Sequence, residues 1–377
     1  MMTLRERVLA VLNRQKPDVV PWLGDLAYYF DYLKETGGIA DKYKESPSDK
    51  FLSEKGIQQF HRDLGIGFYL QGYFPFKTVH NNVSITLNNE NGLSVQEIET
   101  PYGKLRNVWQ YLEDSYCWGH KEHMIKSTKD LKALRYLYEN TSYEPDYELA
   151  QIRKGLIGDN GVLLCYLPKS PLMECIANLS GIEALIECLS DEPGETEETL
   201  ELMGRKHDEA AEIALNSPAE CLMIPENISS EVVGKVLYEN YMKYYEEKWV
   251  KCIRNAGKYS FVHLDGTMRG LIRELSDSGF DVIEALTTAP VGDIAIEELH
   301  QWVREDTIMW GGLPGALLAD STSDAYFDEY VIRTLNIMKT RPGYVLGVAD
   351  QVPPKANWNR LKRVGELVEK YGRYDTK

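Results

Sequence analysis

The sequence predicts an α/β protein built as a single (β/α)8 barrel, with an antiparallel β excursion inserted after the second strand. Eight apolar runs of strand length alternate with helical segments, as such a barrel requires. No Gly-, Pro- or Ser-rich linker divides the chain, so residues 1–377 are interpreted as one domain. A doubly wound fold would need a glycine-rich phosphate loop after the first strand, where only Gly24 is found. The eight runs end at Asp25, Gly72, Pro168, Glu226, Asp265, Thr287, Gly312 and Asp350.

The N-terminal part predicts a helix and two strands. The helix ends before Pro17, because a residue that precedes proline is forced out of helical geometry. Residues 19–25 and 66–72 form the first two predicted strands, with largely helical chain between them. From residue 79 to 112, apolar and polar residues alternate between turn sequences, which predicts the antiparallel excursion of two to four strands. Its expected role is to cover one end of the barrel, and the alternative is a lid.

The βα rhythm resumes after Ser127. A helix over 128–138, an acidic turn and a helix from Tyr147 lead to the third strand. Continuous apolar runs, such as Val162–Leu167, are typical of strands buried in a parallel sheet. The last predicted helix covers Trp358–Tyr371.

The stretch from Tyr259 to Asp293 reads as strand, helix and strand, which implies two parallel strands. It brings polar side chains to the carboxyl ends of those strands, where α/β proteins carry their chemistry. Over the whole chain the same reasoning predicts a site at the barrel mouth. Asp25, Glu226 and Glu284 are its candidate acid/base groups, and Tyr69, Gln71, Asn227 and Gln351 are its candidate substrate-binding groups.

His263 is the most informative of the seven histidines. It lies two residues before Asp265 on a strand, so both side chains point to one face and permit two ligands to one ion. His263, Asp265 and Asp350 are therefore the candidate ligands of a divalent metal, with zinc as the first choice. The alternative is a buried histidine bonded to its neighbour. The other histidines are predicted to lie on the surface.

Bulk properties exclude several classes of protein. The formal net charge of −16 opposes binding to nucleic acid or to an anionic membrane, and a small-molecule substrate fits better. The six scattered cysteines show no disulfide or zinc-ribbon spacing, and we expect reduced thiols in a cytoplasmic protein. The first residues lack the apolar core of a signal peptide. A homodimer is one expected assembly.

Five blocks of the chain resemble the uroporphyrinogen decarboxylase superfamily, and the similarity extends over almost the whole sequence. They are RERVLAVLNRQKPDVVPW, TPYGKLR, FVHLDGTMRGLIRELSDSGFDVIEALTTAPVGD, IMWGGL and GVADQVPP. The resemblance implies a (β/α)8 barrel with its pocket at the carboxyl ends of the strands. It also implies one of two chemistries, decarboxylation or corrinoid-dependent methyl transfer.

The decarboxylase branch carries an arginine-rich motif after the first strand that binds the carboxylates of the substrate. The equivalent stretch here, GDLAYYFDYLKETGG, has no arginine and brings acidic residues instead. A polycarboxylate substrate is therefore disfavoured by charge.

The methyltransferase branch holds zinc with a His-x-Cys pair and a later cysteine. His263 matches the histidine, whereas Asp265 and Asp350 stand in or near the cysteine positions. The resemblance therefore favours methyl transfer between a small methoxy or methylamine type substrate and a corrinoid carried by a partner protein. A decarboxylase of a porphyrinogen or smaller acid is the alternative. A ligand-binding barrel without catalysis is a further one.

Overall fold

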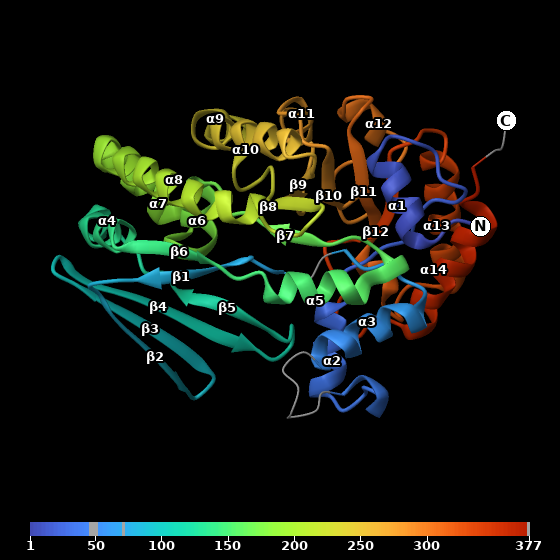
Figure 1. Cartoon of the computed structure of the whole chain (residues 1–377), viewed down its shortest axis with the longest axis horizontal. Coiled ribbons are helices and arrows are strands. Elements are labelled where there is room, and N and C mark those ends of the chain that lie inside the picture. The colour runs from blue at the N-terminus through green and yellow to red at the C-terminus, as the bar shows by residue number, and fades with distance from the viewer. Residues whose placement is uncertain (45–51, 70–71, 375–377) are drawn as a thin grey trace.

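The computed structural model describes residues 1–44, 52–69 and 72–374. Figure 1 shows a central parallel sheet flanked by helices, with antiparallel strands at one end of the long axis. Helix α1 and the N-terminus lie at the opposite end. The antiparallel strands therefore lie far from the first helix.

Six strands form the parallel sheet, in the spatial order β12-β11-β10-β9-β8-β7, and every neighbouring pair is parallel. Their order in space follows their order in the chain, and helices lie between consecutive strands. This confirms the predicted α/β class. The strands are β7 (Leu164–Tyr166), β8 (Cys221–Ile228), β9 (Tyr259–Leu264), β10 (Val282–Leu286), β11 (Ile308–Pro314) and β12 (Tyr344–Ala349).

The first two predicted strands, over 19–25 and 66–72, form only isolated bridges in their described residues, and all of these are parallel except Val19 with Arg373. Trp22 pairs with Leu346 of β12, Leu23 with Gly67, and Phe68 with Gly161 just before β7. The pairing thus runs from one edge strand of the sheet towards the other through these two segments. Residues 19–25 form no regular strand, because the N–H of Val20 bonds to Gly372 and Pro21 has no N–H to give.

The helices lie mainly between consecutive strands of the sheet. No helix of the described ranges combines the length and the apolar character needed to cross a bilayer. The helices are α1 (Leu4–Leu12), α2 (Ala27–Glu35), α3 (Leu52–Leu64), α4 (Leu131–Glu139), α5 (Glu148–Ile157), α6 (Pro171–Glu174), the π-helix η4 (Cys175–Leu179), α7 (Gly181–Asp191), α8 (Pro193–Leu215), α9 (Gly234–Tyr241), α10 (Lys243–Asn255), α11 (Ile272–Asp277), α12 (Leu299–Trp302), α13 (Asp324–Met338) and α14 (Trp358–Tyr371).

The antiparallel strands extend beyond the predicted range of 79–112. Four of them form one sheet in the order β2-β3-β4-β5, and β1 pairs separately with β6. The segment predicted as an acidic turn is strand β6, because its partner β1 lies some sixty residues away and no local pattern reveals it. The strands are β1 (Phe76–His80), β2 (Ser84–Glu90), β3 (Leu93–Thr100), β4 (Gly103–Leu112), β5 (Cys117–Glu122) and β6 (Thr141–Pro145).

Two separate clusters of buried apolar residues show that the parallel sheet is buried on both faces. The larger cluster lies mainly between the strands and the helices. The smaller one, here called the inner core, takes residues from all six strands and from both bridging segments. Side chains alternate along a strand, so Phe261 of β9 belongs to the inner core whereas Val262 packs on the helix side. The inner core comprises Val8, Val11, Leu12, Leu23, Tyr69, Val162, Leu164, Cys221, Met223, Phe261, Val282, Ile308, Trp310 and Val345.

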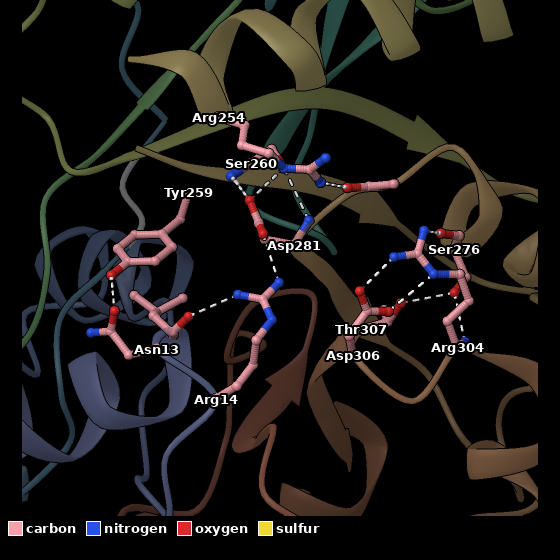
Figure 2. A network of polar contacts seen from close by, with 12 residues as sticks. Asn13, Arg14, Arg254, Tyr259, Ser260, Ser276, Asp281, Arg304, Asp306 and Thr307 are labelled. Carbon is pink, nitrogen blue, oxygen red and sulfur yellow. Dashed lines mark hydrogen bonds and ion pairs between the residues drawn. The ribbon is translucent and has the colours of Figure 1, made fainter. Parts of the chain in front are cut away.

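Helix α1 covers the amino ends of the strands. Three of its side chains belong to the inner core, and the residues just after it are fastened to β9 and its neighbour (Figure 2). Arg14 donates to the Asp281 carboxylate at 2.7 Å, and Asp281 accepts from Ser260 N–H at 3.0 Å. Tyr259 O–H also donates to Asn13, at 3.0 Å. These contacts hold α1 against the sheet at the end away from the predicted site.

Replacing Gly161 by alanine is expected to destabilise the fold by roughly 2–4 kcal/mol. Gly161 has a φ of +156°, and an added Cβ would lie 1.8 Å from the carbonyl oxygen of Phe68. The substitution would therefore break the bridge that joins residues 66–69 to the start of β7. Urea denaturation gives the change in the free energy of unfolding.

Gly155→Ala is the matched control, since Gly155 lies in α5 and a Cβ there meets no atom within 4 Å. It should stabilise the protein by about 0.5–1 kcal/mol, because alanine is the better helix former. Equal effects of the two substitutions would contradict the close packing at Gly161.

Candidate active site

Four of the predicted site residues lie on the inner side of the sheet: His263, Glu284, Asp25 and Tyr69, of which Tyr69 belongs to the inner core itself. His263 has the parity of Phe261 on β9, and Glu284 has that of Val282 on β10. Asp25 follows Leu23 in the same way. His263 is 5% exposed, Asp25 2% and Glu284 0%. These polar side chains therefore lie at the carboxyl ends of the strands, next to the inner core, and are almost completely shielded from solvent.

A hydrogen-bonded chain joins three of these side chains. The Tyr69 hydroxyl donates to Glu284 Oε1 at 2.6 Å, and His263 Nδ1 bonds to Glu284 Oε2 at 2.6 Å. Both carboxylate oxygens of Glu284 are thereby used. The remaining ring nitrogen of His263, Nε2, has no hydrogen-bond partner and lies 3.6 Å from Asp350 Oδ1.

Asp350 connects this chain to a pocket of about 560 Å³ at the carboxyl ends of β9 to β12. The pocket wall includes Asp265, Asp350 and Gln351, and Lys355 is its one cationic residue. The Asp350 side chain is 46% exposed, so it stands between the buried chain and solvent. The carboxyl-end pocket is thus an acidic opening above a buried histidine.

The electrostatics of the cluster favour a protonated imidazole. Burial opposes charge on His263, but the adjacent Glu284, its hydrogen bond and the charges of Asp350 and Asp265 raise the His263 pKa to about 9. Burial raises the pKa of Asp350 to about 6, although the charge of His263 opposes the rise. Near neutral pH His263 can therefore donate a proton from Nε2 towards the carboxyl-end pocket.

Asp25 lies in the same layer, and burial raises its pKa to about 7. The bond from Ala27 N–H to its carboxylate, 2.8 Å long, opposes this rise, whereas the charges of Asp350 and Glu284 reinforce it. Asp25 is thus poised to gain or lose a proton near neutral pH, as an acid/base group requires.

Asp25→Asn is expected to stabilise the protein more at pH 8 than at pH 4, by roughly 3 kcal/mol. Because the Asp25 pKa is higher in the folded chain, the folded state binds more protons between pH 4 and 7. The free energy of unfolding of the wild type therefore falls as pH rises through that window. The asparagine variant should not show this decrease, because its side chain does not ionise. Urea denaturation at a series of pH values measures the difference.

Asp114→Asn, in the exposed turn between β4 and β5, is the control and should shift stability equally at every pH. A stability difference between Asp25→Asn and wild type that stays constant from pH 4 to pH 8 would show that Asp25 ionises normally in the folded chain.

The predicted metal ligands do not form a metal site as they stand. Across residues 1–44, 52–69 and 72–374, no three or more His, Cys, Asp or Glu side chains are arranged to hold an ion. His263 and Asp350 face each other, whereas Asp265 shares only the pocket wall. The raised pKa of His263 also means that a metal would have to displace a proton from Nε2.

Two predicted site residues, Glu226 and Asn227, lie away from the cluster. Glu226 has the parity of Leu222 and Ile224, which pack on the helix side, and it accepts bonds from Ser170 N–H at 3.0 Å and Ser170 O–H at 3.1 Å. Asn227 is exposed and accepts from Lys169 at 3.4 Å. Burial nevertheless raises the Glu226 pKa to about 7, against the charge of Lys169.

The predicted substrate-binding residues have different outcomes. Tyr69 belongs to the hydrogen-bonded chain, and Gln351 lines the carboxyl-end pocket with a buried Oε1 that has no partner. Gln71 lies outside the described residues. Tyr166 was not predicted, yet burial and the charges of Asp25 and Glu284 raise its pKa, which places it beside the cluster. Tyr166 lies two residues after Leu164 of the inner core, so side-chain alternation could have predicted that it faces the same side of the sheet.

Two of the histidines expected on the surface are buried. His61 is 0% exposed and its Nδ1 lies 3.2 Å from the carbonyl oxygen of Ile66, while His207 is 4% exposed and its Nδ1 lies 2.9 Å from that of Lys169. In both, burial lowers the pKa, so these residues are neutral groups of the core. All six cysteines are free, and four of them are buried.

A parallel sheet with polar groups gathered at its carboxyl ends is the arrangement of α/β enzymes. The sequence profile of the uroporphyrinogen decarboxylase (URO-D) family matches residues 163–371, which is more than half of the chain. The chain belongs to this family. The matched region contains β7 to β12, and with them His263, Glu284 and Asp350. No curated protein sequence matches the chain.

Comparison with solved structures supports the fold. A methyltransferase from Methanosarcina mazei aligns over 98% of this chain and 99% of its own, with a TM-score of 0.63 and 11% identity. At this identity the similarity concerns the fold alone. A chitinase from Flavobacterium johnsoniae aligns over 63% of this chain and 91% of its own, with 10% identity, and its TM-score of 0.34 carries no argument.

Proposed function

We propose that the parallel sheet closes into an eight-stranded barrel through residues 19–25 and 66–69, and that the protein is a methyltransferase. It would move a methyl group between a small methylated substrate and a corrinoid carried by a partner protein. The observation that carries this proposal is the Tyr69–Glu284–His263 chain, whose free Nε2 faces the carboxyl-end pocket. Full-length alignment with a methyltransferase fold agrees with it.

His263 supplies the proton in this mechanism. When a methyl group leaves an oxygen or nitrogen of the substrate, the bonding electrons stay on that atom, and the Nε2 proton neutralises it. Glu284 holds the imidazole in place through Nδ1 and stabilises its charge, and Tyr69 fixes Glu284. Asp350, whose Oδ1 lies 3.6 Å from Nε2, is placed to return the proton between turnovers. The corrinoid would supply a reduced cobalt that accepts the methyl group.

The carboxyl-end pocket sets the class of substrate and the source of the corrinoid. Its carboxylates, Asp265 and Asp350, outnumber its single lysine, so a neutral or cationic methylated compound fits better than a polycarboxylate. This charge balance speaks against porphyrinogen decarboxylation. A pocket of about 560 Å³ is also too small to enclose a corrin ring with its side chains, so a carrier must present the ring at the opening.

The test uses the full-length protein, cob(I)alamin and a panel of methoxylated and methylated-amine donors. Methyl transfer changes the cobalt absorption spectrum, and the expected result is a change with at least one donor that requires the protein. Methylation of the same corrinoid by methyl iodide controls for its reactivity. A competent corrinoid that keeps its spectrum with every donor, both alone and on a carrier protein, would refute the proposal.

A metal-dependent form of the same reaction is the second candidate. A bond from histidine Nδ1 to a carboxylate, with Nε2 left free, is how proteins commonly orient metal-binding histidines. Zinc would be the simplest ion, and His263, Asp265 and Asp350 its ligands after rearrangement. Elemental analysis of the wild type and of His263→Asn discriminates the two forms. Stoichiometric zinc that the substitution removes would support the metal-dependent form.

A further inference from the structure

A second cavity, of about 410 Å³, lies between the antiparallel strands and the helices α4, α6, η4 and α8. We call it the aromatic cavity. Gln96 and Ile98 of β3 lie on one side of it, and Lys169 and Glu174 after β7 on another. It shares no lining residue with the carboxyl-end pocket, and its volume is ordinary for a small-molecule site.

Aromatic rings form one wall of this cavity. Phe76 of β1 meets Tyr143 of β6 edge to face, with ring centroids 5.5 Å apart, and Phe74 lies 5.5 Å from Phe76. Tyr138 of α4 also lines the cavity. Phe74 is 40% exposed, which is unusual for so large an apolar ring and marks an uncovered surface. Clustered aromatic faces attract organic cations.

Glu174 gives the aromatic cavity its charge. Its Oε2 accepts a bond from Asn178 at 2.9 Å, and within the described ranges no lysine or arginine forms an ion pair with it. Lys169 also lines the cavity and feels the charge of Glu174, but its ammonium group donates to the Pro225 carbonyl and to Asn227, both on β8. Burial lowers the pKa values of His80 and His207, so neither lining histidine adds positive charge at neutral pH.

We propose that the aromatic cavity binds an organic cation, an ammonium compound with an apolar body, with the ammonium group at Glu174 and the apolar body against Phe74, Phe76 and Tyr143. The cavity is too large for a bare ammonium ion, and Glu174 is its one lining carboxylate. This site is separate from the carboxyl-end pocket and does not depend on methyl transfer. Phe74 also contacts Tyr166, at 5.3 Å, so its wall adjoins the buried cluster.

Isothermal titration calorimetry with three probes that share a benzyl group tests the proposal. Benzyltrimethylammonium should bind at least about tenfold more tightly than neutral benzyl alcohol or anionic phenylacetate. Glu174→Gln keeps an oxygen for the bond from Asn178 but removes the charge, and it should abolish this preference. Glu183→Gln, an exposed position on the nearby helix α7, should leave all three affinities unchanged.

The acidic carboxyl-end pocket is the competing location, and Asp265→Asn distinguishes the two. Loss of binding of benzyltrimethylammonium in Asp265→Asn, with unchanged binding in Glu174→Gln, would overturn the proposal. Equal affinities for the three probes, or no binding of the cation at millimolar concentration, would also overturn it. Phe76→Leu provides a second readout, because loss of the ring should weaken the binding of benzyltrimethylammonium more than the binding of benzyl alcohol.

Discussion

Replacing Glu284 by alanine is expected to destabilise the protein by roughly 3–5 kcal/mol. Removal of one partner of a buried charged pair leaves the other charge buried without a counter-charge. The carboxylate is 0% exposed and bonds to His263 and Tyr69 at the same time. Alanine would leave the Tyr69 hydroxyl without its acceptor and the imidazole without the charge that raises its pKa. Urea denaturation at pH 7 measures the loss.

Glu297→Ala is the matched control for this substitution. Glu297 also pairs with a basic residue, Arg333 at 3.4 Å, but both side chains are about half exposed. Its removal should cost no more than about 0.5 kcal/mol, as is usual for surface ion pairs. A cost below 1 kcal/mol for Glu284→Ala would mean that the buried chain contributes little to stability.

Replacing His263 by asparagine is expected to lower kcat/KM for methyl transfer by about 10²- to 10⁴-fold, the usual contribution of a general acid. Asparagine preserves a polar side chain but has no proton to transfer at this position. The loss should fall mainly on kcat, because His263 is buried below the pocket and not on its wall. The corrinoid absorbance assay measures both constants.

The wild-type rate should also fall as the pH rises through about 9, where His263 loses its proton. His300→Asn, a substitution on helix α12, is the control and should retain full activity and the same pH profile. Unchanged kcat in His263→Asn would exclude the proposed proton donor while leaving methyl transfer itself open.

Much of the fold follows from local sequence patterns. Apolar runs predict β7 to β12 because each is a single continuous strand with both faces buried, and the final helix has the predicted bounds, Trp358–Tyr371. The first two predicted strands differ from the structure because their backbone groups find other partners, such as Gly372 for Val20. Strand β6 depends on β1, and a pairing so distant in sequence leaves no local trace.

The candidate site could also be predicted from the sequence only in part. His263, Glu284 and Asp350 could be predicted from their positions at strand ends, and they lie together. Glu226 could not be assigned correctly from its position alone, since one step of alternation decides which face of a strand a side chain occupies. Tyr166 has the inward parity but lies in an apolar run, where a tyrosine is usually interpreted as packing. The aromatic cavity takes its lining from seven helices and strands, and only tertiary structure assembles it.

Helix α1, bonded through Arg14 to Asp281, covers the amino ends of the strands, whereas Asp350, 3.6 Å from His263 Nε2, lines the carboxyl-end pocket. In the proposed methyltransferase, the demethylated product and the next substrate would therefore bind in the same pocket, and the product would act as a competitive inhibitor.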